Sequence, residues 1–322
     1  MPSRSASYLL VGLAALASVS AAAEQNCAPD PYKDAANDPC NHFRYVPNRA
    51  LNATACVLYA ALGCIFIFNH VRYKAWYFLA LTIGTFMMAI GIAVRVAFYY
   101  NLHWRGGYIF QQMFIILSPC LLIAANYVLL GRIANHIDAQ SHMFIRPARV
   151  ARVFIISDVI TFVIQGGGGG MAAGGGNIAN IGVKLLLAGL VAQLVSFGLF
   201  SLMWCLFTYR VWRDAVLWNH PGWHALNWVL GFNCIMFLIR SVFRTVEFSQ
   251  GWTGHLATHE VYWAVLDCLP IFLAISLYTW YWPGRILSPH SQVTRQEFIQ
   301  MGTSDKSPEV SPQVHPAHSL WA

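Results

Sequence analysis

Long runs of apolar residues alternate with short polar segments along the chain. Seven runs are long enough, at 1.5 Å per residue, to cross about 30 Å of hydrocarbon as α-helices. Backbone amides cannot stay unpaired in lipid, and a helix pairs them within one segment. The pattern therefore predicts an all-α integral membrane protein with seven transmembrane helices, at residues 51–69, 75–96, 110–131, 152–171, 184–208, 226–247 and 257–281.

The fourth run ends in a sequence with poor helix propensity. Gln165 is followed by glycine at 166–170 and again at 174–176. In a membrane such glycines either let two helices approach closely or break a helix that lines a cavity. They are not a phosphate-binding loop, because no Lys-Ser or Lys-Thr follows them. We therefore expect no nucleotide cofactor and no ATP-driven pumping by this chain alone.

The ends of the chain differ from its centre. Residues 1–23 have a charged start, a short apolar stretch and small residues before Glu24, which predicts a cleaved signal peptide. An uncleaved anchor, giving an eighth helix, is the alternative. Residues 24–50 are then an extracellular segment, residues 51–284 the seven-helix domain, and residues 285–322 a disordered cytosolic tail.

The extracellular segment contains Cys27 and Cys40. Behind a signal peptide these residues meet an oxidising compartment, so a disulfide between them is expected, with two free thiols as the alternative. The sequon Asn52-Ala-Thr54 lies at the start of the first span. We expect Asn52 to remain unglycosylated because it is too close to the membrane.

Composition and charge agree with this topology. Hydrophobic residues make up 57% of the chain and charged residues only 10%, whereas soluble domains have about 25% charged residues. With the N-terminus outside and the C-terminus inside, cytosolic lysines and arginines outnumber external ones by eleven to five. The net charge of +7 is spread over short loops, so nucleic acid is not an expected partner.

Ionisable residues within the spans are the strongest chemical signal. If left unpaired in lipid, they would cost about 20 kcal/mol together, so they must pair, face water or lie near the interface. Carboxylates outnumber cations by four to three in this set: Arg95, Asp158, Arg240, Arg244, Glu247, Glu260 and Asp267.

Spacing places most of these charges on two neighbouring helices. Arg240, Arg244 and Glu247 lie on one face of the sixth span, and Glu260 and Asp267, seven residues apart, are predicted to share a face of the seventh. The short loop between the spans makes their helices antiparallel neighbours, with Asp267 near the depth of Arg240. Either a polar cavity for a substrate or a purely structural ion network fits this pattern.

Two histidines have the spacing of a helical metal site, but the other features of such a site are missing. His255 and His259 are four residues apart, as in helical metal sites. The HExxH pattern is absent, and the second and third spans offer no matching histidine and carboxylate. No nucleophile–base pair is visible either. We therefore expect no metal, no cofactor and no enzymatic activity.

The ordered set of motifs resembles the fungal RTA1-like proteins, also called the lipid-translocating exporter family. The resemblance covers roughly residues 40 to 285, and its last third is the most specific. It is carried by Tyr45-Val-Pro47, Pro119, Tyr127, Leu130-Gly131-Arg132, Ser157-Asp158, Gln165 with the glycines after it, Gly189, Gln193, Arg244, Glu247, Gly251, Gly254, Glu260, Asp267 and Pro283-Gly284.

The resemblance implies a plasma-membrane protein linked to resistance against toxic amphiphiles and to movement of sphingoid bases or related lipids. Membrane lipids or amphiphilic small molecules are the implied partners. Family members usually carry a glutamate where this chain has Met88, three residues before Gly91, so Arg95 must find another partner. A seven-helix receptor is the rival function. The candidate binding or translocation residues are Arg244, Glu247, Glu260, Asp267, Asp158, Gln165, Arg240 and Arg95.

Overall fold

The computed structural model describes residues 32, 33, 35, 38, 41, 43–143, 147–173, 176–218, 223–251 and 254–287. The predicted signal peptide, Cys27, Cys40 and the tail beyond 287 lie outside these residues. Cleavage and the disulfide therefore stay predictions.

Seven helical segments in the described part are long and apolar enough to cross a membrane. No described residue lies in a β-strand. The prediction of a multi-pass, all-helical membrane protein is confirmed, while its orientation stays a prediction. The spans are α2 (Arg49–Tyr73), η2 with α3 (Trp76–Phe78, Leu79–Ala97), α4 (Arg105–His136), α5 (Pro147–Ala173), α6 (Gly176–Arg213), α8 (His224–Ser249) and the composite α9–η4–α10 (Glu260–Trp263, Ala264–Cys268, Leu269–Trp280).

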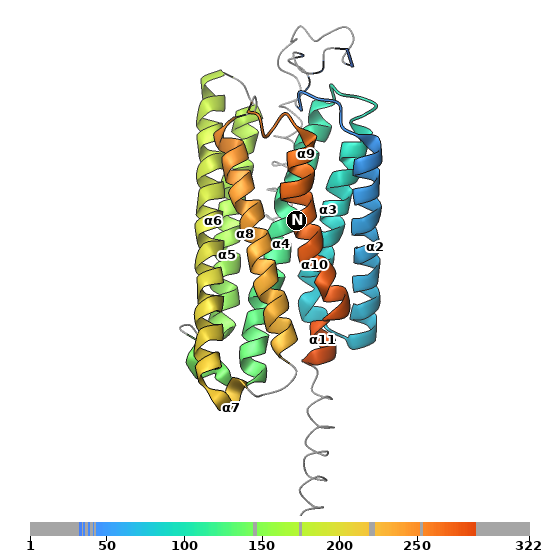
Figure 1. The fold of residues 1–322 in the computed structure, drawn as a ribbon. Coiled ribbons are helices and arrows are strands. Elements are labelled where there is room, and N and C mark those ends of the chain that lie inside the picture. Colours follow the sequence, from blue (N-terminus) through green and yellow to red (C-terminus); the bar gives the residue numbers. More distant parts are fainter. Residues whose placement is uncertain are drawn as a thin grey trace, which may run out of the picture.

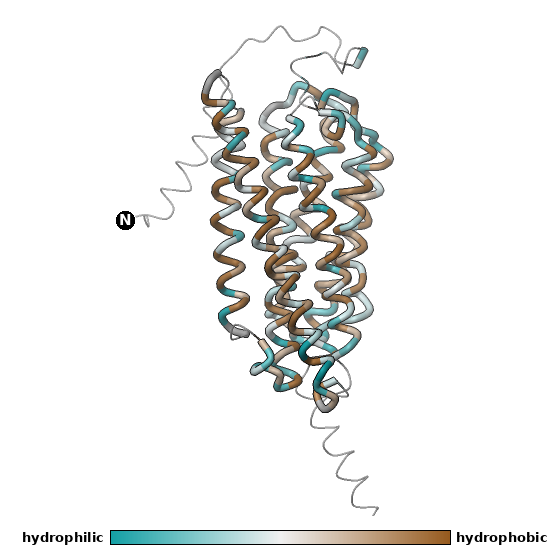
Figure 2. The backbone as a smooth tube through the Cα atoms, turned by 60° about the vertical axis from the view of Figure 1, so that its left-hand side comes forward, coloured by the Kyte–Doolittle hydropathy of each residue, from teal (hydrophilic) through white to brown (hydrophobic). Residues whose placement is uncertain are grey.

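Consecutive spans pack side by side and close into a ring (Figure 1). α2 packs on α3, α3 on α4, α4 on α5, α5 on α6, α6 on α8, α8 on α10, and α10 back on α2; α4 also contacts α8 across the ring. The short elements η3 (Ala139–His142), α7 (Ala215–Trp218) and α11 (Pro283–Ile286) follow the ends of α4, α6 and α10. Hydrophobic residues predominate between the two ends of the bundle (Figure 2).

The glycine-rich segment stays helical. α5 continues through glycines 166–170 to Ala173, and the reason lies in its packing against α6. A Cβ added at Gly168 would come 2.5 Å from the backbone nitrogen of Leu186, and one added at Gly182 would come 2.6 Å from the Gly168 carbonyl oxygen. Of the two interpretations of the glycines, close helix approach is therefore the one the structure supports.

The seventh span contains a π-helical turn. η4 (Ala264–Cys268) interrupts the α-helical pattern between α9 and α10, and it carries Asp267. Pro270 follows at the start of α10, where its missing N–H removes a hydrogen bond from the same region. A π-turn rotates less per residue than an α-turn, so the two halves of the span present different faces.

Candidate functional site

A buried carboxylate joins two arginines between α8 and the π-turn. Asp267 is fully buried, and Arg244 binds it through two parallel hydrogen bonds, Nε to Oδ1 at 3.0 Å and Nη2 to Oδ2 at 2.5 Å. The Nε of Arg240 lies 2.8 Å from Oδ1, although its N–H makes no hydrogen bond there. Arg240 instead donates from Nη2 to the carbonyl of Ile115 on α4, at 3.2 Å. This cluster fixes α8 against α4 and the seventh span.

Glu247 extends the cluster toward solvent. Its Oε2 accepts a hydrogen bond from Nη1 of Arg244 at 3.1 Å, three residues earlier on α8. Its Oε1 makes no hydrogen bond with any residue that the structure describes, and the side chain is 13% exposed. Glu247 therefore has one carboxylate oxygen that accepts no hydrogen bond from the described residues.

Arg95 on α3 lies inside an aromatic enclosure. Its guanidinium carbon is 4.0 Å from the ring centre of Trp263 and 4.7 Å from that of Phe43. Its Nη2 donates to the hydroxyl of Tyr45, and its Nε lies 3.6 Å from Oε1 of Glu260. Arg95 therefore has partners in this chain, although Met88 stands where family members usually carry a glutamate.

Tyr45 lies in the segment before α2, outside the spans. Burial raises the pKa of its phenol above the usual value, although the positive charge of Arg95 acts in the opposite direction. The phenol therefore stays protonated at neutral pH, and Arg95 keeps its hydrogen-bond acceptor there.

Glu260 serves the start of α2. Its Oε1 accepts from Nδ2 of Asn52 at 2.6 Å and its Oε2 from the backbone N–H of Asn48 at 2.8 Å. Asn48 in turn caps α2 by accepting from the backbone amides of residues 50 and 51. The prediction that Glu260 and Asp267 share a face is wrong: Glu260 turns toward α2 and Arg95, and Asp267 toward α8. The π-turn between them removes the rotation on which the seven-residue spacing relied.

These contacts give a second reason to expect that Asn52 carries no glycan. Its side chain is fully buried, and its amide nitrogen donates to both Glu260 and the Asn48 carbonyl. We expect wild-type protein to show no mass shift after glycosidase treatment. A shift that disappears in the Asn52→Gln variant would contradict both the topology argument and this geometry.

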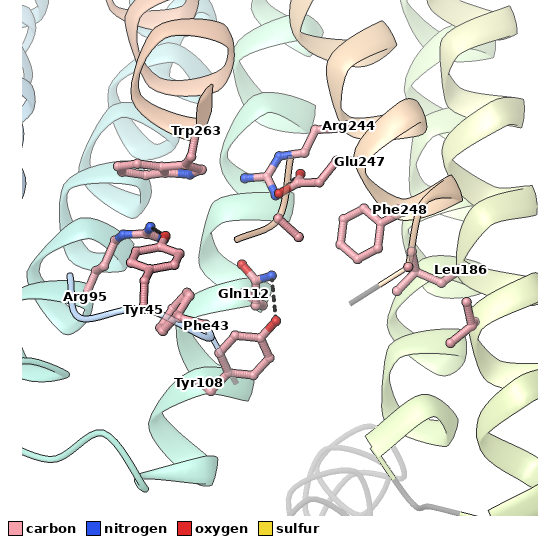
Figure 3. A pocket seen from close by; sticks show the side chains of 13 residues that line it. Phe43, Tyr45, Arg95, Tyr108, Gln112, Leu186, Arg244, Glu247, Phe248 and Trp263 are labelled. Carbon is pink, nitrogen blue, oxygen red and sulfur yellow. Dashed lines mark hydrogen bonds and ion pairs between the residues drawn. The ribbon is translucent and has the colours of Figure 1, made fainter. Parts of the chain in front are cut away.

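A pocket opens beside Glu247 at the end of the bundle where the segment before α2 crosses it (Figure 3). The space open to the centre of a water molecule is ≈ 50 Å³, enough for a few waters or a small polar group. Its wall is formed by the segment before α2, by α3, α4, α6, α8 and α9, and by the loop between α8 and α9. The lining residues are Phe43, Tyr45, Arg95, Tyr108, Gln112, Val183, Leu186, Arg244, Glu247, Phe248, Gly251, Ala257 and Trp263.

Asp158 and Gln165 lie elsewhere, between α4, α5 and α6. The hydroxyl of Tyr127 donates to Oδ2 of Asp158 at 2.9 Å. Gln165 donates to Gln193 at 2.9 Å, and Gln193 donates to the sulfur of Cys120 at 3.2 Å. We call these five residues the α5 cluster.

Asp158 lies apart from the other six charged residues, and this changes the charge balance expected from the sequence. Three arginines (Arg95, Arg240, Arg244) remain with three carboxylates (Glu247, Glu260, Asp267) at the pocket end, and their charges cancel. The surplus of carboxylates is therefore not a property of the pocket. The feature that sets the pocket apart is the Oε1 atom of Glu247, which has no hydrogen-bond partner among the described residues.

Several residues of the site carried no specific sequence signal. Trp263, Tyr108 and Gln112 lie in apolar spans and resemble ordinary interface or core residues until the helices are packed. Tyr45 belongs to a motif of the resemblance, but nothing local to it indicated Arg95, fifty residues away. In the part of the chain that the structure describes, no group of three or more histidine, cysteine, aspartate or glutamate side chains forms a metal site.

Comparison with known proteins decides the family. The family described as RTA1 like protein matches residues 81–290, well over half of the chain. The chain belongs to the RTA1-like family. Protein RTA1 of Saccharomyces cerevisiae is 30% identical over 273 residues, which cover 76% of this chain and 85% of that protein. The resemblance inferred from the motifs is thereby confirmed.

Two further relatives from the same yeast have names that describe a cargo. Protoporphyrin uptake protein 1 is 30% identical over 194 residues, covering 60% of this chain and 64% of that protein. Sphingoid long-chain base transporter RSB1 is 22% identical over 288 residues, covering 78% of this chain and 75% of that protein. No solved structure matches the chain.

Proposed function

We propose that this RTA1-like protein moves lipid-like amphiphiles across the membrane and holds their polar head group in the pocket beside Glu247. The observation that carries the proposal is the carboxylate oxygen of Glu247 without a hydrogen-bond partner among the described residues, in the wall of the pocket. A donor-rich, positively charged head group complements that oxygen. A long-chain amine with neighbouring hydroxyl groups, such as a sphingoid base, has this chemistry.

The pocket size and the surrounding spans support an amphiphile in which only the head enters. About 50 Å³ admits an ammonium and a hydroxyl but not a whole lipid. The apolar chain would stay in the hydrocarbon that surrounds the helices. The names of the two cargo-bearing relatives describe transport and uptake, which favours a transporter over a receptor or an enzyme.

The proposal places the protein in the plasma membrane with the pocket on the outer side. The charge bias of the loops supports an external N-terminus. Tyr45 and Phe43, in the segment before the first span, line the pocket, so the pocket shares their side of the membrane. Resistance to toxic amphiphiles is the cellular consequence that follows.

We expect Glu247→Gln to impair transport while the protein still folds. Glutamine keeps an acceptor for Arg244 but removes the charge that attracts an ammonium. Hydrogen bonds to charged groups contribute about 1.5–3 kcal/mol, so head-group affinity should fall roughly 10- to 100-fold. Uptake of a radiolabelled sphingoid base into reconstituted vesicles measures the effect, with a neutral lipid of equal chain length run in parallel.

Asp138→Asn is the matched control, because it makes the same acid-to-amide change at an exposed site after α4. Asp138 has φ 53°, which asparagine tolerates well. Its transport should equal that of wild type. Unchanged uptake of the sphingoid base by Glu247→Gln, at normal protein level, would refute the head-group site.

A further inference from the structure

Asp158 is a buried carboxyl group without a cationic partner. Its side chain is 3% exposed, near the middle of α5. The Tyr127 hydroxyl serves Oδ2, and Oδ1 has no hydrogen-bond partner among the described residues. Every other carboxylate that lies within a described span forms an ion pair with arginine. Asp158 therefore differs from them in its surroundings, although it is almost as deeply buried as Asp267.

The described groups around Asp158 are neutral ones. α4 contributes Tyr127 and Cys120, and α6 contributes the amide of Gln193. On α8, Cys234 is the titratable residue near Tyr127. The ring of Tyr127 packs against Phe154 of α5 and Phe200 of α6. No described lysine, arginine or histidine forms an ion pair with Asp158.

An ionised carboxylate in this position would be an uncompensated charge inside the membrane. Such a charge is expensive there, and proton relays in pumps and transporters are built from buried acids of this kind. The carboxylic acid form removes the charge. Protonation also makes the carboxyl group a hydrogen-bond donor as well as an acceptor. Its Oδ1 has no hydrogen-bond partner among the described residues.

We propose that Asp158 is a proton-binding site, protonated in this conformation, whose uptake and release of a proton accompany the movement of the amphiphile. The inference rests on the proposed transport function. The step is a simple acid–base one: the carboxylate accepts a proton at Oδ1 and returns it, and no other bond changes. Release requires water or a cation to reach the carboxylate, so it requires a second conformation of the bundle.

Gln165 lies about two turns beyond Asp158 on α5, toward the contact between Gly168 and the pocket residue Leu186. Gln165, Gln193 and Cys120 form a hydrogen-bonded chain across α5, α6 and α4. Cys120 lies within electrostatic range of both Asp158 and Arg240. Arg240 also binds the α4 carbonyl of Ile115 and lies against Asp267. Cys120 thus lies near both Asp158 and the arginine cluster beside the pocket.

Infrared spectroscopy of the full chain in vesicles tests the protonation state without any transport. We expect wild-type protein at pH 7 to show the carbonyl stretching band of a neutral carboxylic acid, and Asp158→Asn to lack it. Asp138→Asn should keep the band, because it leaves Asp158 and its surroundings unchanged. Absence of an acid band that depends on Asp158 at pH 7 overturns the proposal.

Accumulation of a radiolabelled sphingoid base in the same vesicles tests the coupling. With one proton exchanged per amphiphile, a gradient of one pH unit should raise accumulation about tenfold over collapsed-gradient vesicles. Protein-free vesicles are subtracted to remove passive partition of the amine. Asp158→Asn should lose the response to the gradient.

The outcomes separate the two ideas. Transport by wild type that ignores the gradient overturns the coupling and leaves the proposed function standing. Wild type that moves no sphingoid base under any gradient defeats the proposed function and the coupling with it, while the infrared band still decides whether Asp158 binds a proton.

Discussion

Replacing Asp267 with asparagine is expected to destabilise the protein by about 3–5 kcal/mol, since it removes the carboxylate that two buried arginines share. Arg240 and Arg244 are both almost fully buried, and both lie against Asp267. Asparagine keeps the shape but accepts only at one oxygen and carries no charge. We therefore expect little Asp267→Asn protein at the cell surface and a large fall in its melting temperature in detergent.

A second substitution tests whether the unpaired arginine charge causes the loss of stability. Arg240 has Asp267 as its ion-pair partner among the described residues, whereas Arg244 keeps Glu247. Arg240→Leu in the Asp267→Asn background removes the cation left without a carboxylate, so it should recover part of the lost stability, which a double-mutant cycle measures. Glu247→Gln, by contrast, should keep normal abundance because its side chain is partly exposed. Asp267→Asn protein at wild-type level and with wild-type melting temperature would show that the buried ion network does not hold the helices.

Replacing Gly182 with alanine is expected to force α5 and α6 apart. The added methyl group would overlap the backbone nitrogen of Ala172 and lie 2.6 Å from the carbonyl oxygen of Gly168. Both obstacles are backbone atoms, so no side chain can move aside. Overpacking of this kind costs about 1–3 kcal/mol. A lower melting temperature of the purified variant is the measurement.

Gly170→Ala is the matched control, because Gly170 belongs to the same glycine-rich part of α5 but lies outside the contact with α6. No atom lies within 4 Å of a Cβ at Gly170, so the methyl group is accommodated. Alanine in place of glycine inside a helix contributes up to about 1 kcal/mol of stability, and we expect a melting temperature equal to or above that of wild type. Equal effects of the two substitutions would mean that the glycines do not set the distance between α5 and α6.

Local pattern was enough for the helices themselves. The length of each apolar run fixes how many times the chain can cross a bilayer, because lipid leaves the backbone no other partner than its own helix. The same holds for the face shared by Arg240, Arg244 and Glu247, since regular α-helical spacing links residues that are three and four apart. The short loop after α8 likewise made α8 and the seventh span neighbours, which the packing of α8 on α10 confirms.

The choice of partners depended on contacts between distant segments, which no local pattern contains. Arg95 contacts Tyr45 and Glu260, the latter 165 positions further along the chain. Among the described residues, Tyr127 is the only hydrogen-bond partner of the Asp158 carboxyl group. Seven charges allow many pairings of similar cost, so their number alone selects none of them.

The sequence did not predict the irregular backbone of the seventh span either. The π-turn at Ala264–Cys268 redirects Asp267 away from the face of Glu260, and apolar residues around it give no sign of the change in helical pitch. The glycines of α5 were readable as a break or as a close contact. Their helical form follows from the partner helix, because the contact with α6 supplies the packing that glycine propensity lacks. Helix count and helix faces thus follow from periodicity in a lipid solvent, whereas the pocket, the ion pairs and the isolation of Asp158 exist only once seven helices pack together.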